Sequence, residues 1–111
     1  MNELVARLSN GEHTIQVSRR KPLAAYLKER IELGHVHVFF EDTGTEIGIS
    51  IDRGKSDYSG GDFENSSGGI HLEGFVTLNY EKVRCVIDVS LSDLKGKGML
   101  VAASEEEYYS L

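Results

Sequence analysis

The longest alternation of apolar and polar positions covers residues 70–91 and predicts two strands folded back on each other. Even positions are apolar in its first half and odd positions in its second: Ile70, Leu72, Val76, Leu78 and Tyr80, then Val83, Cys85, Ile87, Val89 and Leu91. A tight hairpin joins two such faces when the position numbers of opposed residues have an odd sum. A two-residue loop at Glu81 and Lys82, with Val76 opposite Ile87, meets this condition, and so does a four-residue loop over residues 79–82. We expect a hairpin with one buried face and keep both turns open.

Shorter alternations predict further strands on either side of this hairpin. Apolar residues at even positions from Val36 to Phe40 face apolar residues at odd positions from Ile47 to Ile51, with residues 42–45 as the loop. Residues 92–98 are typical of a turn, and Met99 to Ala103 could form a last short strand. Residues 104–111 are expected to be a frayed acidic tail.

The N-terminal segment has two interpretations. Apolar residues at positions 4, 6 and 8, the pair Asn10-Gly11, and then Ile15 and Val17 form a hairpin pattern around a favoured two-residue turn. The composition of residues 2–8, which is rich in Glu, Leu, Ala and Arg, also suits a short helix. The alternation favours the hairpin slightly.

One helix is predicted over about residues 22–33. Pro22 suits the first turn of a helix, and Gly34 suits a left-handed cap at its end. Spacings of three and four place a set of apolar residues on one face: Leu23, Tyr26, Leu27 and Ile31. Because no second helix is predicted to cover this face, it should pack on the sheet.

These elements predict a single α+β domain over residues 1–111. Its length and its 40% hydrophobic content suit one core. We expect a mainly antiparallel twisted β-sheet of six to seven strands with the helix packed on one face. The other face would be wet or would curl toward a partly closed barrel. Residues 52–69, with five glycines and four serines, are expected to form a flexible Gly/Ser/acidic loop.

The net charge of −6 is unevenly distributed. Residues 1–55 hold eight basic and eight acidic side chains, whereas residues 56–111 hold four and ten. This surplus disfavours nucleic acid as a partner and favours a basic protein. The nearest approach to a basic patch is Arg19, Arg20 and Lys21, followed by Lys28 and Arg30. Three consecutive basic residues before a helix are more often a solvated loop than a binding site, so we expect them to be solvated.

The expected cellular location follows from two signals that the sequence lacks. It has no apolar run long enough to span a bilayer and no secretory signal, so we expect a cytoplasmic protein that does not bind membranes. The single cysteine, Cys85, falls on the predicted core face, where it would act as a small hydrophobic residue in a reducing compartment.

Candidate chemistry is sparse. His35 and His37 lie two positions apart on one predicted strand, and His71 and Glu73 repeat this spacing on another. Side chains at this spacing share a face and could hold a zinc or iron ion if a further ligand reached them. The alternative is that they line the wet faces of amphipathic strands. No nucleophile elbow or phosphate-binding loop is present, so we expect neither an enzyme nor a cofactor.

The remaining candidate is an acidic segment within the long loop. Residues 57–64 interleave carboxylates with aromatic rings: Asp57, Tyr58, Asp62, Phe63 and Glu64. Such a segment could enter a basic cleft, where carboxylates meet Lys or Arg and rings supply apolar contact. It could equally be a surface loop without a partner.

A short acidic α+β chain with this loop resembles the immunity proteins that neutralise toxins of bacterial contact-dependent growth inhibition. The resemblance implies a cognate toxin made by the same cell, often a basic nuclease, held inactive in a tight complex. The residues assigned to the interface come from the charge argument alone. Two other hypotheses are a metal or small-ligand module at His35, His37, His71 and Glu73, and a homo-oligomer joined through a sheet edge.

Overall fold

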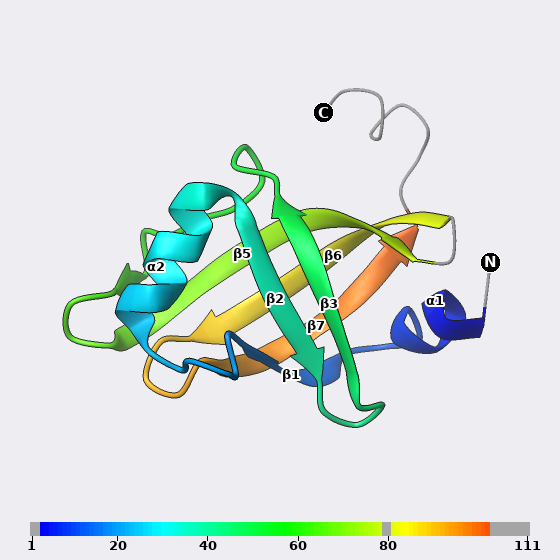
Figure 1. The fold of residues 1–111 in the computed structure, drawn as a ribbon, viewed down its shortest axis with the longest axis horizontal. Helices are drawn as coiled ribbons and strands as arrows, with labels where there is room; N and C mark the ends of the chain where they lie inside the picture. Colours follow the sequence, from blue (N-terminus) through cyan, green and yellow to red (C-terminus); the bar gives the residue numbers. More distant parts are fainter. Residues whose placement is uncertain (1–2, 79–80, 103–111) are drawn as a thin grey trace.

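Six antiparallel strands close into a barrel in the computed structural model (Figure 1), which describes residues 3–78 and 81–102. The elements in chain order are α1 (Glu3–Leu8), β1 (His13–Val17), α2 (Ala24–Leu33), β2 (His35–Phe40), β3 (Thr45–Ile51), β4 (Gly61–Asp62), β5 (Ser67–Leu78), β6 (Glu81–Ser90) and β7 (Lys95–Ala102). The fold is therefore α+β and mainly β, as the sequence predicted.

The barrel closes where β3 meets β5. The sheet order is β3-β2-β1-β7-β6-β5-β4, and an additional pairing of β3 with β5 joins Ser50 to Phe75 and Ile51 to Gly74. A Cβ atom at Gly74 would press on the backbone carbonyl of Ser50, so glycine lets the two strands approach. Because the barrel is closed, less unpaired strand edge is left for β-sheet pairing with a second copy of the chain. Association with a second copy stays a prediction.

The barrel is filled by aliphatic side chains and covered at its two ends by the helices. Figure 1 places α2 and α1 at opposite ends of the long axis of the molecule. Val5 and Leu8 from α1, and Leu27 and Ile31 from α2, belong to the same hydrophobic core as the strand residues. The Cys85 side chain is fully buried in this core, and burial raises the pKa of its thiol to about 12.

The central hairpin is confirmed, but both registers proposed for it are wrong. Leu78 pairs with Glu81 and Val76 with Val83, and residues 79–80, which separate the two strands, lie outside the described residues. The inner faces still match, because the sum of opposed positions remains odd. Contacts across the outer face stabilise this register: His71 pairs with Asp88 and Phe75 with Arg84. The apolar alternation could not distinguish registers that differ by two.

The N-terminal hairpin is also wrong, because the segment forms the helix α1. Strand β1 already pairs with β2 on one side and β7 on the other, which leaves no edge for a preceding strand. Val5 and Leu8, spaced three apart, are both fully buried. The weaker of the two interpretations was therefore the right one.

The second hairpin and the predicted helix are confirmed. The β2–β3 hairpin forms, but its register is shifted by two: Val38 pairs with Ile47 and Phe40 with Thr45, so the connecting residues are 41–44 and not the expected 42–45. Helix α2 ends at Gly34, whose φ of 88° allows its backbone N–H to bond the last carbonyls of the helix. The buried face differs in detail, since Leu23 precedes the helix and is 56% exposed, while Ala24 is buried.

Strand β7 begins at Lys95, four residues before the predicted strand. The segment assigned to a turn contains Gly96 and Gly98, which lie in the strand. A Cβ atom at Gly96 would overlap the carbonyl oxygen of Asp88, and one at Gly98 would overlap the side chain of Ile87. These glycines permit close strand packing rather than a turn. Residue 103 and the tail 104–111 lie outside the described residues.

Candidate functional site

The acidic loop follows the outside of β5 and is hydrogen-bonded to it. The backbone N–H of Asp52 donates to the carbonyl of Glu73 at 2.8 Å. Asp57 and His71 exchange two backbone hydrogen bonds, each of 2.9 Å. Further along, β4 pairs with the first residues of β5. These bonds place residues 52–66 beside the barrel, and the flexibility predicted for the loop stays a prediction.

Turn hydrogen bonds orient two of the three loop carboxylates. Asp57 accepts bonds from the backbone N–H and the hydroxyl of Ser59, at 2.9 and 2.7 Å. Asp62 accepts bonds from the backbone of Glu64 and from the backbone and side chain of Asn65, at 2.7–3.1 Å. These bonds, those from the side chains of Ser59 and Asn65 above all, lower the pKa of Asp57 and of Asp62. Both carboxylates therefore stay ionised at neutral pH.

The three carboxylates of the loop lack ion pairs with Lys or Arg among the described residues, although the nearby charge of His71 contributes to the lowered pKa of Asp57. Asp57, Asp62 and Glu64 are all exposed. Within residues 3–78 and 81–102, no Lys or Arg side chain forms an ion pair with any of the three. The loop therefore presents to solvent three carboxylates that no described Lys or Arg side chain pairs.

The two aromatic rings of the loop face the barrel more than the solvent. Tyr58 and Phe63 are partly buried and pack against the hydrophobic core. The Tyr58 hydroxyl is buried and has no hydrogen-bond partner in the part of the chain that the structure describes. The rings thus help to hold the loop on the barrel, and only their exposed parts are open to a partner.

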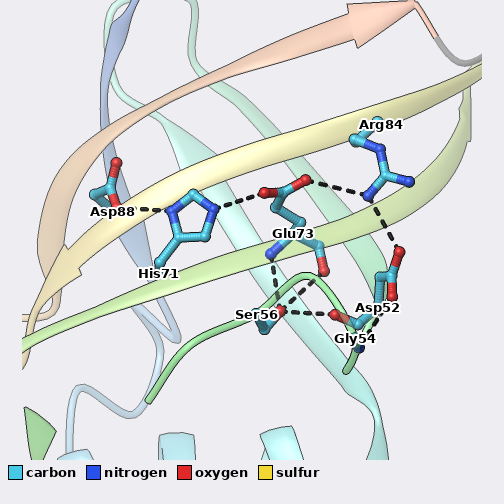
Figure 2. Close-up of polar contacts among 7 residues, drawn as sticks. All are labelled: Asp52, Gly54, Ser56, His71, Glu73, Arg84 and Asp88. Atoms are coloured by element: carbon cyan, nitrogen blue, oxygen red, sulfur yellow. Dashed lines mark hydrogen bonds and ion pairs between the residues drawn. The ribbon is translucent and has the colours of Figure 1, made fainter. Parts of the chain in front are cut away.

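Next to the loop, a chain of polar contacts crosses the outer face of β5 and β6 (Figure 2). Nε2 of His71 lies 2.7 Å from Oε2 of Glu73, and Nδ1 lies 2.8 Å from Oδ1 of Asp88. Nη1 of Arg84 bonds both Glu73 and Asp52, each at 3.2 Å. The chain of contacts therefore alternates acidic and basic groups along the sheet.

This arrangement favours the protonated form of His71. Hydrogen bonds to Glu73 and Asp88 raise its pKa against the opposing effect of burial. Both carboxylates accept, so the doubly protonated ring, which has two donors, suits the site. With both nitrogens engaged, His71 is poorly placed to act as a base or as a metal ligand.

The metal-site alternative finds no support in the geometry. His35 and His37 contact each other edge to face, with ring centroids 5.5 Å apart, while His71 and Glu73 bond each other on another strand. Burial, and then the charges of His37 and Arg30, lower the pKa of His35. Among the described residues, no three His, Cys, Asp or Glu side chains gather so that they could hold a metal ion.

An open groove of about 760 Å³ lies beside the acidic loop. Asp57, His71 and Asp88 line one part of it, and Lys95 and Lys97 of β7 line another. Its mixed charges could receive a polar side chain of a partner. Sequence reasoning missed this groove, because it depends on the register of β5, β6 and β7.

A second, smaller pocket was also missed. It has a volume of about 260 Å³ and combines side chains from the turn after β1, from α2 and from the β2–β3 hairpin: Arg19, Arg20, Lys21, Arg30, His37 and Glu46. The sequence signal was present in the clustered basic residues, which we interpreted as solvated. The tertiary fold brings four of them to one pocket, where Arg19 and Arg20 pair with the carboxylate of Glu46.

No protein-family model matches this chain, and no curated protein matches it at a significant level. None of the helices in the described part of the chain has the length and apolar character needed to cross a membrane.

Proposed function

We propose that this protein is an acidic inhibitor of the immunity type, which acts in the cytoplasm by binding a basic protein toxin and has no catalytic activity of its own. The observation that carries the proposal is the group of three exposed carboxylates, Asp57, Asp62 and Glu64, which have no ion-pair partner among the described residues. A protein with a net charge of −6 gains no folding stability from leaving these charges unpaired.

Hydrogen bonding supports a binding role for this loop. The turn bonds to Asp57 and Asp62 fix both carboxylates before any partner arrives. Preorganised groups lose less conformational entropy on association. Negative charge also accelerates the encounter with a basic surface and disfavours acidic competitors. The loop would therefore contribute to the association rate and to specificity.

A nuclease toxin is the target class that suits these charges best. A nuclease binds phosphates through clustered Lys and Arg side chains. The carboxylates of Asp57, Asp62 and Glu64 would pair with these Lys and Arg side chains and so block the nucleic-acid-binding cleft of the toxin. The exposed parts of Tyr58 and Phe63 would add apolar contact, and the adjacent groove would accept one side chain of the toxin.

The test is a binding titration with the basic protein encoded beside this chain. Affinity should fall steeply between about 0.01 and 1 M salt, over which the screening length falls from about 30 to about 3 Å. Glu64→Lys should weaken binding about tenfold, which corresponds to about 1.4 kcal/mol. Asp62→Asn, which keeps an acceptor for the turn but removes the charge, should weaken it less.

Glu3→Lys is the matched control. It makes the same change of charge as Glu64→Lys but lies on α1, at the end of the barrel away from β4 (Figure 1). Glu3 forms only an exposed pair with Arg7, so its loss should cost little stability. Binding that ignores salt, or equal losses in the two Lys variants, would contradict the proposal.

A further inference from the structure

The small pocket beside α2 concentrates positive charge in an otherwise acidic protein. Four permanent cations line it, Arg19, Arg20, Lys21 and Arg30, against the single carboxylate of Glu46. Nε of Arg19 lies 2.7 Å from Glu46, and Nη2 of Arg20 lies 3.8 Å from it. One carboxylate is thus shared by two guanidinium groups.

The other two cations have no carboxylate partner within the described ranges. Nζ of Lys21 lies over the ring of Tyr26, 4.8 Å from its centroid. Arg30 forms no ion pair with any described residue, and its charge helps to lower the pKa of His35 nearby. Like charges this close repel one another, so an anion bound among them would stabilise the folded state.

Backbone geometry fixes the side of the pocket that follows β1. Ser18 is buried and has a positive φ of 50°, which starts a sharp turn. Its N–H donates to the carbonyl of His37, and its carbonyl accepts from Lys21, at 3.2 and 3.0 Å. The Arg19 guanidinium is held over the ring of Phe39, 4.0 Å from its centroid. The basic side chains therefore start from a defined scaffold.

We propose that this pocket binds a phosphate group, either as inorganic phosphate or as a phosphate monoester. Guanidinium groups match the oxygens of phosphate in pairs, and a lysine adds a point charge. The volume of about 260 Å³ is just below the range of about 300–1,000 Å³ typical of drug-sized ligands, which suits a small anion. None of the three loop carboxylates lines this pocket, so the site is independent of the proposed toxin interface.

The test is an NMR titration of the full chain with inorganic phosphate at constant ionic strength, with chloride as the balancing anion. We expect saturable shifts of the backbone amides from Arg19 to Lys21 and of the His37 ring. Arg30→Gln should weaken binding about tenfold, because it removes one charged contact. Glutamine keeps helix propensity, and a circular dichroism spectrum will show whether the fold is intact.

Arg7→Gln is the control, since it removes the same charge from an exposed position on α1. Phosphate binding should be unchanged in this variant. A parallel titration with O-phosphoserine separates the two ligand sources: tighter binding than phosphate indicates a monoester, and weaker binding indicates the free ion. Shifts that do not saturate, or equal weakening in Arg30→Gln and Arg7→Gln, would overturn the proposal. Neither readout depends on the toxin or on Glu64.

Discussion

Arg84 lies on the outer face of the barrel, yet only 11% of its side chain is exposed. It sits between the carboxylates of Asp52 and Glu73, and its guanidinium lies 4.3 Å from the centroid of the Phe75 ring. A nearly buried cation is tolerated only where its hydrogen bonds are satisfied. Arg84 therefore links the start of the acidic loop, at Asp52, to strands β5 and β6.

Arg84→Leu should lower the free energy of unfolding by about 1.5–3 kcal/mol, because two partly buried carboxylates lose the donor they share. Urea denaturation monitored by circular dichroism measures this change. Arg7→Leu removes an exposed arginine whose pair with Glu3 contributes only about 0.3–0.5 kcal/mol. Equal losses in the two variants would show that the Arg84 contacts contribute no more than a surface pair.

At the level of single elements, periodicity predicted the structure where the chain carried both a repeating pattern and an end signal. The β2–β3 hairpin and α2 were predicted for this reason, with Gly34 marking the end of the helix. Residues 4–8 carry an alternation that slightly favours a strand and a composition that also suits a helix. The choice is made by β1, whose two edges are occupied by distant strands, and no local pattern contains that information.

The candidate site was only partly predictable, for the same reason. The composition of the loop showed its carboxylates, whereas its attachment through Asp57 and His71 depends on the register of β5. The basic residues of the small pocket were visible in the sequence. Their meeting with His37 and Glu46, which come from the following hairpin, follows only from the tertiary fold.

Strand β7 tests whether the close approach of two strands at a glycine contributes to stability. Gly96→Ala should lower the free energy of unfolding by about 1–3 kcal/mol, because the new Cβ would overlap the carbonyl of Asp88 on β6. Gly54→Ala is the control, since its Cβ would meet only Asp52 Oδ1 at an ordinary 3.6 Å. We expect that variant to change stability by less than about 1 kcal/mol. Thermal unfolding of both proteins measures the difference, and a neutral Gly96→Ala would contradict it.

At the scale of the whole molecule, the free energy of unfolding should depend on pH through two histidines whose pKa values are shifted in opposite directions. The pKa of His71 is raised above the ordinary value of about 6.5 by Glu73 and Asp88. Its contribution to stability is complete below that value and is lost as pH rises through the folded pKa. The pKa of His35 is lowered, first by burial, so its contribution is complete above about 6.5 and is lost as pH falls through its folded pKa.

The two histidines therefore act on opposite sides of about pH 6.5, and substitution separates them. In His71→Gln, the decline of the unfolding free energy as pH rises above about 6.5 should disappear. In His35→Gln, the loss of unfolding free energy as pH falls below about 6.5 should disappear, while the decline caused by His71 at higher pH remains. Urea denaturation at half-unit steps of pH measures both slopes. If His71→Gln changed stability by the same amount at every pH, the hydrogen bonds from His71 to Glu73 and Asp88 would not stabilise an imidazolium, and the chain of contacts in Figure 2 would have to rest on Arg84 alone.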